Sequence, residues 1–344
     1  MVSYILEEPK KIRAVETKIP VPTDTEVLIH VKYVGICGSD IHLFNGTYNA
    51  PHSYPLRFGH EWSGVVEAVG KNVTKVSVGD SVTGDCSQYC GVCPMCAKDK
   101  NLCAHIEKFG ITVDGATSEY IIRDEKYVYK APEGVGLSHL CLTEPVAVAA
   151  HLIEKVRKSV PEGFIDKRVL VLGGGVIGMS ALMLFIHMEG CKQVELYDLS
   201  EHRTEIAKSE NAVIPMAEDM DPGEGGGDYA SMYATAKYDV VIETTGVPSV
   251  FANAFNLVKP GGVLGCVGMA AKAEIPQKLI VTKSLTVVGS IGGTGDFPRA
   301  MEFLQKCPHS AKKLVSHYLP IGKAEEAFLL ARDTAISMKV ILEV

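Results

Sequence analysis

The chain has 344 residues, more than one hydrophobic core usually accommodates, so two domains are expected. Hydrophobic residues make up 47% and charged residues 22% of it, which is typical of a folded globular protein and excludes a disordered or fibrous one. The formal net charge is −7 and no run of Lys or Arg occurs. Such a surface repels phosphate backbones, so we expect no nucleic-acid partner.

No targeting signal is recognisable in the sequence, so we expect a cytoplasmic location. The N-terminal segment has no apolar stretch followed by a cleavage site, so no secretion signal is expected. Apolar runs such as residues 169–172 and 179–186 are too short or too interrupted by glycine to cross a bilayer, so no membrane partner is expected. We therefore expect the ten cysteines to be kept reduced, which argues against a disulfide framework.

The first 150 or so residues predict a mostly antiparallel β domain. Short, β-branched segments alternate with Gly, Pro, Asn and Asp. The predicted strands are residues 26–33, 64–69 and 118–122, with a strand–turn–strand corner at 76–82. A helix at residues 145–156 then leads into the second half.

From residue 168 onward, apolar strands alternate with helical stretches, which predicts a parallel sheet with helices on both faces. The predicted strands are residues 169–172, 193–197, 240–243, 263–267 and 286–289. The glycine-rich, polar residues 220–233 predict a surface loop. Helices at 298–307 and 323–331 and a final strand at 339–343, which we expect to return to the first domain, complete the chain.

A dinucleotide-binding signature opens the second half. The strand at 169–172 runs into a Gly-x-Gly-x-x-Gly turn made by Gly173, Gly175 and Gly178, and a helical run follows. In this context the first glycine permits the tight turn, the second lets the backbone approach a pyrophosphate, and the third lets helix and strand pack closely. Phosphates would bind at the helix N-terminus.

The acidic residue that ends the next strand predicts the choice of cofactor. Asp198 lies about 20 residues past the glycines, where a carboxylate binds the adenosine ribose and repels a 2′-phosphate. We therefore expect NAD rather than NADP. Arg203 is close enough in sequence to reach a 2′-phosphate if Asp198 turned away, so NADP stays open.

Four cysteines within a short segment predict a structural zinc site. Cys90, Cys93, Cys96 and Cys103 offer four soft ligands, which close the tetrahedral shell of zinc and leave no position for substrate. A nucleic-acid-binding zinc ribbon is disfavoured, because the nearby charges form only a small mixed patch. Cys86 lies near this lobe in sequence, but a fifth thiol is surplus to four-coordinate zinc, and we expect no role for it.

A second candidate metal set lies upstream. Cys37, His60 and the adjacent Glu61 combine a thiolate, an imidazole and a carboxylate, a mixed set suited to a catalytic zinc with an open position. Spacing alone does not distinguish this set from residues without a metal, since single Cys and His residues more often have no metal-binding role.

These features occur in a familiar order. The segments 35–42 and 59–64, the cysteine lobe, Glu144-Pro145, the glycine turn and the ending 339–343 follow one another as in the zinc-containing medium-chain alcohol dehydrogenases, which the chain resembles over essentially its whole length. The resemblance is nearest to the sorbitol, xylitol and threonine dehydrogenase branch. It implies an α/β protein with a GroES-like, mostly-β catalytic domain (1–150 and 290–344) and a Rossmann NAD domain (151–289).

The resemblance also implies roles for individual residues. Cys37 and His60 would ligate a catalytic zinc, with Glu61 or Glu144 as a further ligand; which glutamate binds in the resting state is left open. Ser39 would receive the substrate hydroxyl proton and His42 would pass it towards solvent, while Asp40 would brace the loop. The cofactor-binding residues implied are Gly173, Gly175, Val176, Ile177, Gly178, Asp198, Arg203, Val267, Ser290 and Ile291.

The expected activity is NAD-dependent oxidation of a secondary alcohol, of polyol type, to a ketone, with two zinc ions per chain. Alternatives are a threonine or other amino-alcohol dehydrogenase, a diol or aldose dehydrogenase, a zinc-free quinone reductase, and a non-catalytic relative that keeps the fold. A homodimer or homotetramer is expected from the family. The sequence departs from the family pattern at two places. Only six residues separate Cys96 from Cys103, one fewer than usual in the family. The small residues at 292–295 argue against sorbitol itself as the substrate.

Overall fold

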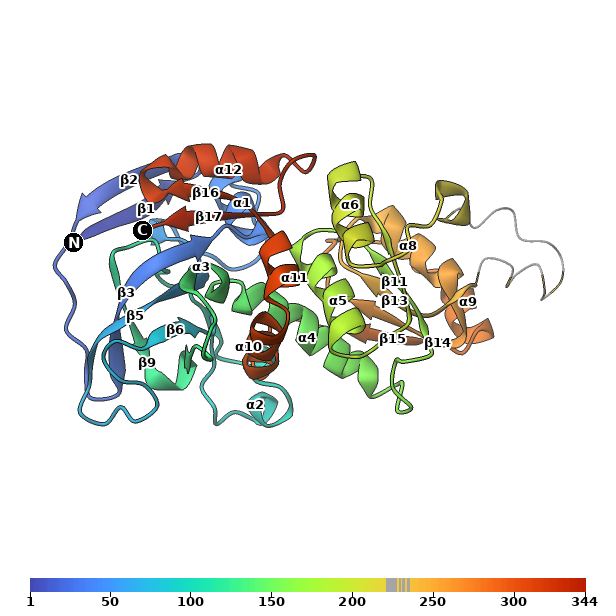
Figure 1. Ribbon diagram of the computed structural model, residues 1–344, viewed down its shortest axis with the longest axis horizontal. Helices are drawn as coiled ribbons and strands as arrows, with labels where there is room; N and C mark the ends of the chain where they lie inside the picture. Colours follow the sequence, from blue (N-terminus) through green and yellow to red (C-terminus); the bar gives the residue numbers. More distant parts are fainter. Residues whose placement is uncertain (221–227, 229, 231–232, 234–235) are drawn as a thin grey trace. The chain divides into compact units, whose positions relative to one another are not determined.

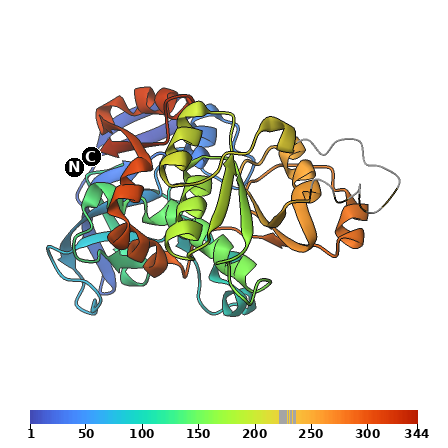
Figure 2. The same cartoon turned by 45° about the vertical axis from the view of Figure 1, so that its right-hand side comes forward.

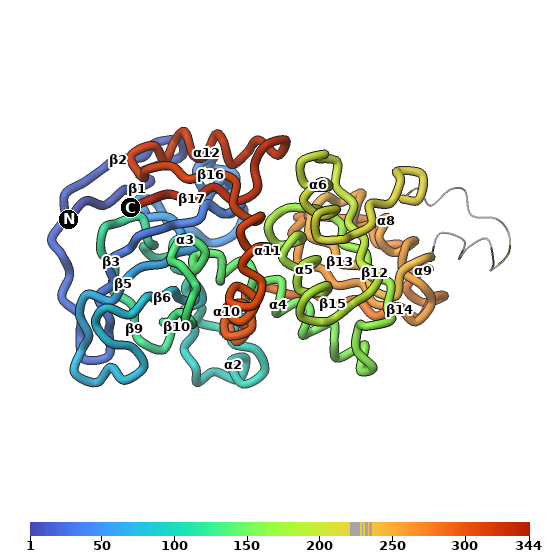
Figure 3. Tube along the Cα trace, viewed as in Figure 1, coloured from blue at the N-terminus to red at the C-terminus, as the bar shows by residue number. Residues whose placement is uncertain are grey.

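The computed structural model describes residues 1–220, 228, 230, 233 and 236–344. Most of the loop predicted at residues 220–233 lies outside the described residues. The chain divides into two compact units, one formed by Met1–Ala147 with Gly292–Val344 and the other by Val148–Ile291. Helix α4 (Thr143–Arg157) carries the chain from the first unit into the second (Figures 1 and 3). No helix among the described residues is long and apolar enough to cross a membrane.

The first unit is built on a large, mostly antiparallel sheet. Its strands follow the order β10-β6-β5-β3-β17-β16, and β9 also pairs with β3. The bounds are β3 Glu26–Gly35, β5 Glu61–Val69, β6 Ser81–Gly84, β9 Tyr120–Asp124, β10 Val128–Lys130, β16 Val315–Pro320 and β17 Lys339–Glu343. The strands predicted at 26–33, 64–69 and 118–122 are thus confirmed within a few residues.

Smaller elements surround this sheet. A second sheet has the order β2-β1-β4, and β7 pairs with β8. Their bounds are β1 Val2–Glu8, β2 Lys11–Glu16, β4 Leu56–Arg57, β7 Ser87–Gln88 and β8 Glu107–Lys108. The helices of this unit are α1 Gly38–Asn45, α2 Pro94–Lys98, α3 Leu137–Leu140, α10 Phe297–Lys306, α11 Pro308–Lys313 and α12 Ala324–Arg332, with short 3-10 helices η1 Lys100–Leu102, η2 Glu125–Tyr127 and η4 Ile321–Lys323.

The C-terminal strand returns to the first unit, as predicted. In β17, Ile341 pairs with Gly35 of β3, and Figures 1 and 2 show the red C-terminal strands beside the blue N-terminal ones. Val340, Ile341 and Leu342 are fully buried, which is why this short apolar run is held in the middle of the sheet. The unit is therefore closed by residues far apart in sequence.

The strand–turn–strand corner predicted at 76–82 is only half right. The turn is present, because Asp80 N–H donates to the Ser77 carbonyl (3.0 Å) and the Asp80 side chain accepts from Ser77 N–H (2.8 Å). Strand β6 begins at Ser81, but residues 76–78 form no strand. Val76 is buried but Val78, which would lie on the same face of a strand, is 63% exposed, so the two valines do not share a buried face.

The second unit is the predicted parallel sheet flanked by helices (Figure 1). Its strand order is β12-β11-β13-β14-β15, and every neighbouring pair is parallel. The strands are β11 Arg168–Leu172, β12 Gln193–Tyr197, β13 Tyr238–Glu243, β14 Val258–Cys266 and β15 Thr286–Gly289. The helices are α5 Val176–His187, α6 Glu201–Ser209, α8 Pro248–Leu257 and α9 Gln277–Thr282, with the 3-10 helix η3 Ala217–Met220.

This strand order places a ligand-binding edge. The chain runs from β11 to β12 on one side and resumes at β13 on the other side of β11. In such sheets, ligands bind at the carboxyl ends of the strands where the order reverses. The carboxyl ends of β11 and β13 are Leu172 and Glu243, so the Gly173 turn lies at that point.

A buried lysine caps the C-terminus of helix α8 in the second unit. Lys283, only 1% exposed, donates from Nζ to the carbonyls of Phe255 (3.0 Å), Asn256 (2.7 Å) and Val258 (3.0 Å). These carbonyls lie at the C-terminus of α8, where the helix itself provides no donors and where a positive charge is favourable.

We expect Lys283→Met to lower the free energy of unfolding by about 3 kcal/mol, because a buried polar group that loses its partner costs about 1–3 kcal/mol and three carbonyls share this donor. Urea unfolding followed by circular dichroism measures the effect. Lys278→Met, which changes an exposed lysine of α9, is the matched control. Equal stability of the two variants would contradict the capping role.

Candidate functional site

The cysteine lobe of the first unit brings its four thiols together. The sulfur–sulfur distances are 3.9 Å for Cys90–Cys96, 3.5 Å for Cys93–Cys96, 3.9 Å for Cys93–Cys103 and 3.6 Å for Cys103–Cys90. A tetrahedral ion with zinc–sulfur bonds of about 2.3 Å requires an edge of about 3.8 Å. The four sulfurs therefore fit a closed tetrahedral metal site.

The backbone of the lobe is arranged to support thiolates. N–H groups of Cys90 and His105 point at Cys103 Sγ (3.3 and 3.4 Å), and Cys93 N–H points at Cys90 Sγ (3.4 Å). Hydrogen bonds from the backbone N–H groups of Ala104 and Cys96 lower the pKa of Cys93 to about 6. The short spacing between Cys96 and Cys103 is spanned by the end of α2 and by η1, so it does not separate the sulfurs.

A second cluster in the same unit joins Cys37, His60 and Glu61. One ligand atom from each lies within 4.8 Å of the others. Cys37 is the N-terminal cap of α1, while His60 directly precedes β5, of which Glu61 is the first residue. The pairing of Gly35 with Glu61 between β3 and β5 brings the two segments together. Thiolate, imidazole and carboxylate together form a donor set that suits zinc.

Asp40 connects the two segments that carry these side chains. Its fully buried carboxylate accepts from Cys37 N–H (2.9 Å) and from Gly59 N–H (3.3 Å), and its Oδ1 lies 3.6 Å from His60 Nδ1. Burial by itself lowers the pKa of His60, but the carboxylate of Asp40 and the thiol of Cys37 raise it well above its ordinary value. This shift favours the protonated imidazole, and a proton on the ring nitrogen competes with a metal ion for it.

Glu61 has a partner that sequence reasoning missed. Lys339 Nζ lies 2.6 Å from Glu61 Oε2 and 2.8 Å from Oε1, and it also donates to the Ile36 carbonyl (2.9 Å). Burial acts to lower the pKa of Lys339, yet Glu61 raises it, and the net shift is upward. Both groups are almost fully buried, so each is the other's counter-ion. The only sequence signal was a lysine opening an otherwise apolar strand.

Glu144 lies beside the cluster rather than within it. It belongs to the first turn of α4, is 6% exposed, and is absent from the set of ligand atoms within 4.8 Å. Burial raises its pKa, an effect that His60 opposes and Glu61 reinforces, so the three groups interact electrostatically.

Cys86, which lies near the cysteine lobe in sequence, is not part of its four-thiol cluster. Its thiol donates to Glu144 Oε1 at 3.3 Å, and burial raises its pKa to about 12. The thiol thus lies at the second cluster. Nothing in its sequence spacing distinguished these two locations.

Ser39 and His42, the two residues expected to carry a proton, lie on α1. Ser39 is half-buried and forms a hydrogen bond with the hydroxyl of Tyr48, whose pKa is raised mainly by burial. His42 is exposed, and its Nδ1 lies 2.9 Å from Thr47 Oγ1. Tyr48 was not anticipated, because an aromatic residue in a polar loop carries no distinctive pattern.

The glycine turn in the second unit has the geometry of a phosphate cradle. Gly173 has a φ of +96°, and a Cβ on Gly178 would lie 1.9 Å from the Gly173 carbonyl oxygen, so neither position tolerates a side chain. A Cβ on Gly175 would meet nothing within 4 Å, which leaves the turn open to a ligand. Val176 and Ile177 begin α5, where the first backbone N–H groups have no partner within the helix.

The other predicted cofactor residues lie at carboxyl ends of the same sheet. Asp198 follows β12 and accepts from Gly174 N–H (2.6 Å) and Ser200 N–H (2.8 Å), while Arg203 lies 3.4 Å from its Oδ2. Val267 follows β14. Ser290 and Ile291 follow β15. The Ser290 hydroxyl is buried without a hydrogen-bond partner among the described residues, and Ile291 is 44% exposed.

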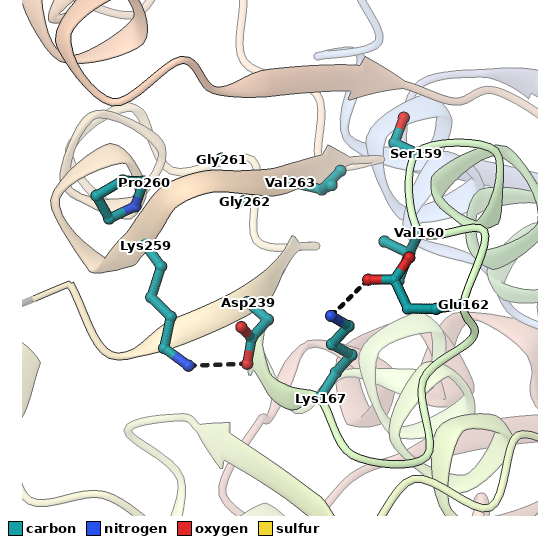
Figure 4. A pocket seen from close by; sticks show the side chains of 10 residues that line it. All are labelled: Ser159, Val160, Glu162, Lys167, Asp239, Lys259, Pro260, Gly261, Gly262 and Val263. Atoms are coloured by element: carbon teal, nitrogen blue, oxygen red, sulfur yellow. Dashed lines mark hydrogen bonds and ion pairs between the residues drawn. The ribbon is translucent and has the colours of Figure 1, made fainter.

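A separate pocket of about 180 Å³ lies at the opposite end of the strands (Figure 4). Asp239, near the amino end of β13, pairs there with Lys259 (2.9 Å), and Lys167 pairs with Glu162 (2.5 Å). Its charged side chains neutralise one another in these two pairs, so the described lining residues present no unpaired charge.

Comparisons with known proteins agree with these features. The family model of the alcohol dehydrogenase GroES-like domain matches residues 23–133, and that of the zinc-binding dehydrogenases matches residues 176–306. The chain is 32% identical to the sorbitol dehydrogenase of Halalkalibacterium halodurans over 317 residues, covering 90% of this chain and 89% of the relative. It is 30% identical to the starvation-sensing protein RspB of Escherichia coli (strain K12) over 346 residues, with 99% of each covered.

Solved structures extend the likeness to the fold. The crystal structure of the short chain alcohol dehydrogenase rspB from E. coli CFT073, complexed with NADH, superposes with a TM-score of 0.87 at 28% identity, covering 100% of this chain and 99% of that one. The expected combination of a GroES-like β domain and a Rossmann-like parallel sheet is confirmed. The chain is therefore an oxidoreductase of the zinc-containing medium-chain alcohol dehydrogenase family.

Proposed function

We propose that this protein is a zinc-dependent NAD oxidoreductase that oxidises a secondary alcohol of the polyol or sugar-alcohol type to a ketone. The observation that carries the proposal is the convergence of Cys37, His60 and Glu61 within 4.8 Å, with Glu144 alongside. The first unit would be the catalytic domain and the second the dinucleotide-binding domain. The likeness to a sorbitol dehydrogenase supports the substrate class.

The energetics favour Glu144 over Glu61 as the carboxylate ligand. Lys339 Nζ contacts both oxygens of Glu61 (2.6 and 2.8 Å), so zinc binding by Glu61 would compete with this buried ion pair, and breaking such a pair costs about 3–5 kcal/mol. Glu144 gives up at most one hydrogen bond from a thiol, and a neutral hydrogen bond contributes only about 0.5–1.5 kcal/mol net. We therefore assign the ligands as Cys37, His60 and Glu144, with one position left for substrate.

Residues near the three proposed zinc ligands would transfer the hydroxyl proton of the substrate. Zinc held there would supply a Lewis acid that lowers the pKa of an alcohol, and bound nicotinamide would accept the hydride. Ser39, half-buried and hydrogen-bonded to Tyr48, would accept the hydroxyl proton of the substrate. His42, exposed and paired with Thr47, would pass the proton to solvent.

The lobe of Cys90, Cys93, Cys96 and Cys103 would hold the second zinc. Four sulfur ligands leave no open position, so its role would be structural. Gly292 has a φ of +70°, and a Cβ there would lie 2.2 Å from Asn101 Oδ1 of this lobe. The segment that begins at Gly292 thus admits no bulky residue at that point, which supports a polyol other than sorbitol. An amino-alcohol or aldose substrate is the alternative within the family.

We expect the wild-type protein to contain two zinc ions and to reduce NAD with a panel of secondary polyols, scored by NADH absorbance. Cys37→Ser should lose one zinc and at least ~1000-fold in turnover, equivalent to about 4 kcal/mol, while still binding NAD. The control is Cys191→Ser, a buried thiol of the second unit that bonds only to backbone carbonyls. Unchanged turnover in Cys37→Ser would refute the catalytic zinc.

The two glutamates should respond differently to removal of charge. Glu144→Gln should weaken zinc binding at the catalytic site by at least ~10-fold, because it alters a ligand. Glu61→Gln should retain the zinc but lower the free energy of unfolding by about 3 kcal/mol, because Lys339 is left buried without its counter-ion. Zinc competition with a chromophoric chelator and urea unfolding measure both effects. The reverse pattern would identify Glu61 as the ligand.

Asp198 should set the preference for NAD. The Asp198→Asn variant keeps the size of the side chain but removes the charge that repels a 2′-phosphate. We expect the ratio of kcat/KM for NAD over NADP to fall by about 10-fold or more, since a hydrogen bond to a charged group contributes about 1.5–3 kcal/mol. Glu201→Ala, an exposed residue at the start of α6, is the control. An unchanged ratio would show that Asp198 does not read the ribose.

A further inference from the structure

The buried thiol of Cys86 has no part in the function proposed above, although it touches one of the assigned zinc ligands. Its S–H donates to Glu144 Oε1 at 3.3 Å, and both side chains are buried. A carboxylate has two oxygens, so this contact occupies Oε1 and leaves Oε2 for another partner.

The backbone around Cys86 is held firmly. Asp85 N–H donates to the Tyr127 carbonyl (2.9 Å), and the Asp85 carbonyl accepts from Arg123 (2.5 Å). The Cys86 carbonyl accepts from Phe109 N–H (2.9 Å), and Ser87 N–H donates to the Asp85 side chain (2.8 Å). The thiol is therefore presented from a fixed point between β6 and β7.

Glu144 is attached to an equally ordered element. It lies in the first turn of α4, next to Thr143, whose hydroxyl donates to the Leu140 carbonyl (2.7 Å). The backbone of Glu144 is thus fixed, and the remaining freedom is rotation of its side chain. A donor fixed on one side of the carboxylate restricts that rotation.

The geometry distinguishes this role from direct coordination by Cys86. The ligand atoms that lie within 4.8 Å of one another come from Cys37, His60 and Glu61, and the Cys86 sulfur is not among them. Cys86 instead reaches the site through Glu144. Groups that hydrogen-bond to a metal ligand orient it, and their loss typically weakens metal binding 10–100-fold.

We propose that Cys86 is a positioning residue of the catalytic metal site: its thiol holds one oxygen of Glu144, so that the carboxylate offers the other oxygen to the metal. This inference rests on the proposed function, because it takes Glu144 as a ligand. It goes beyond that function by giving a role to a thiol outside both metal-binding sets.

The test compares a variant that loses the donor with one that keeps it. Cys86→Ala removes the donor, whereas Cys86→Ser retains a hydroxyl that can donate to the same oxygen. We expect Cys86→Ala to weaken zinc binding at the Cys37 site by about 10–100-fold, measured by competition with a chromophoric chelator, and Cys86→Ser to stay within about threefold of wild type. Cys191→Ala, which removes a buried thiol of the second unit, should have no effect.

The absorption spectrum of cobalt(II) bound at the catalytic site provides a second test beside the zinc affinities. With zinc kept in the cysteine lobe and cobalt(II) in the catalytic site, the ligand-field bands should shift in Cys86→Ala and not in Cys86→Ser. The thiolate-to-cobalt band should disappear in Cys37→Ser alone. A purely structural role for Cys86 would change stability without shifting these bands.

Three outcomes overturn the proposal. Wild-type metal affinity in Cys86→Ala shows that the thiol is not needed, and equal weakening in the Ala and Ser variants shows that side-chain size rather than donation matters. A thiolate band that survives in Cys37→Ser and vanishes in Cys86→Ser makes Cys86 a ligand. Zinc analysis of the wild type distinguishes failure of the Cys86 proposal from failure of the proposed function. A single zinc ion, bound in the cysteine lobe, would contradict both the zinc-dependent function and the role of Cys86. Two zinc ions together with an unaffected Cys86→Ala variant would contradict only the role of Cys86.

Discussion

The proposed metal-binding cluster depends on one buried carboxylate that is not among its proposed ligands. Asp40 accepts hydrogen bonds from the backbone of Cys37 and of Gly59 and faces the imidazole of His60. These contacts connect the start of α1 with the segment that precedes β5, so that a sulfur and a nitrogen from separate parts of the chain point to one place. The same carboxylate favours the charged imidazole while no metal is bound, which links metal binding to release of a proton.

Near this cluster, one buried carboxylate is part of an ion pair within the sheet and another is not. Glu61 and Lys339 neutralise each other in the sheet, and Gly35 leaves the space that the Glu61 side chain occupies, since a Cβ there would lie 2.4 Å from Glu61 Oε2. Among the described residues, the hydrogen bond to the Glu144 carboxylate comes from the Cys86 thiol and not from a cationic side chain. A carboxylate without a cationic partner leaves an oxygen available for a metal, so the two glutamates can have the different roles proposed for them.

The sequence predicts best what is encoded in local patterns. The parallel strands appear as continuous apolar runs, the glycine turn as a spaced motif, and the cysteine lobe as a dense cluster, and the structure shows each element where it was predicted. The missed features depend on contacts between distant segments. Lys339 meets Glu61 only because β17 pairs with β3, and Cys86 turns towards Glu144 because its loop is fixed by residues 109, 123 and 127. The segment 76–78, wrongly predicted as a strand, had the right residue types, but only Val76 is buried while Val78 is exposed.

The return of the last strand to the first unit has a consequence for synthesis. The second unit is one continuous stretch of chain, whereas the first unit is completed by β17, which follows the whole second unit in sequence. Until β17 has been synthesised, residues 33–35 of β3 therefore lack the strand that pairs with them, and Glu61 lacks its counter-ion. Unpaired strand residues are prone to association with other chains, so the first unit is vulnerable to aggregation until β17 is in place.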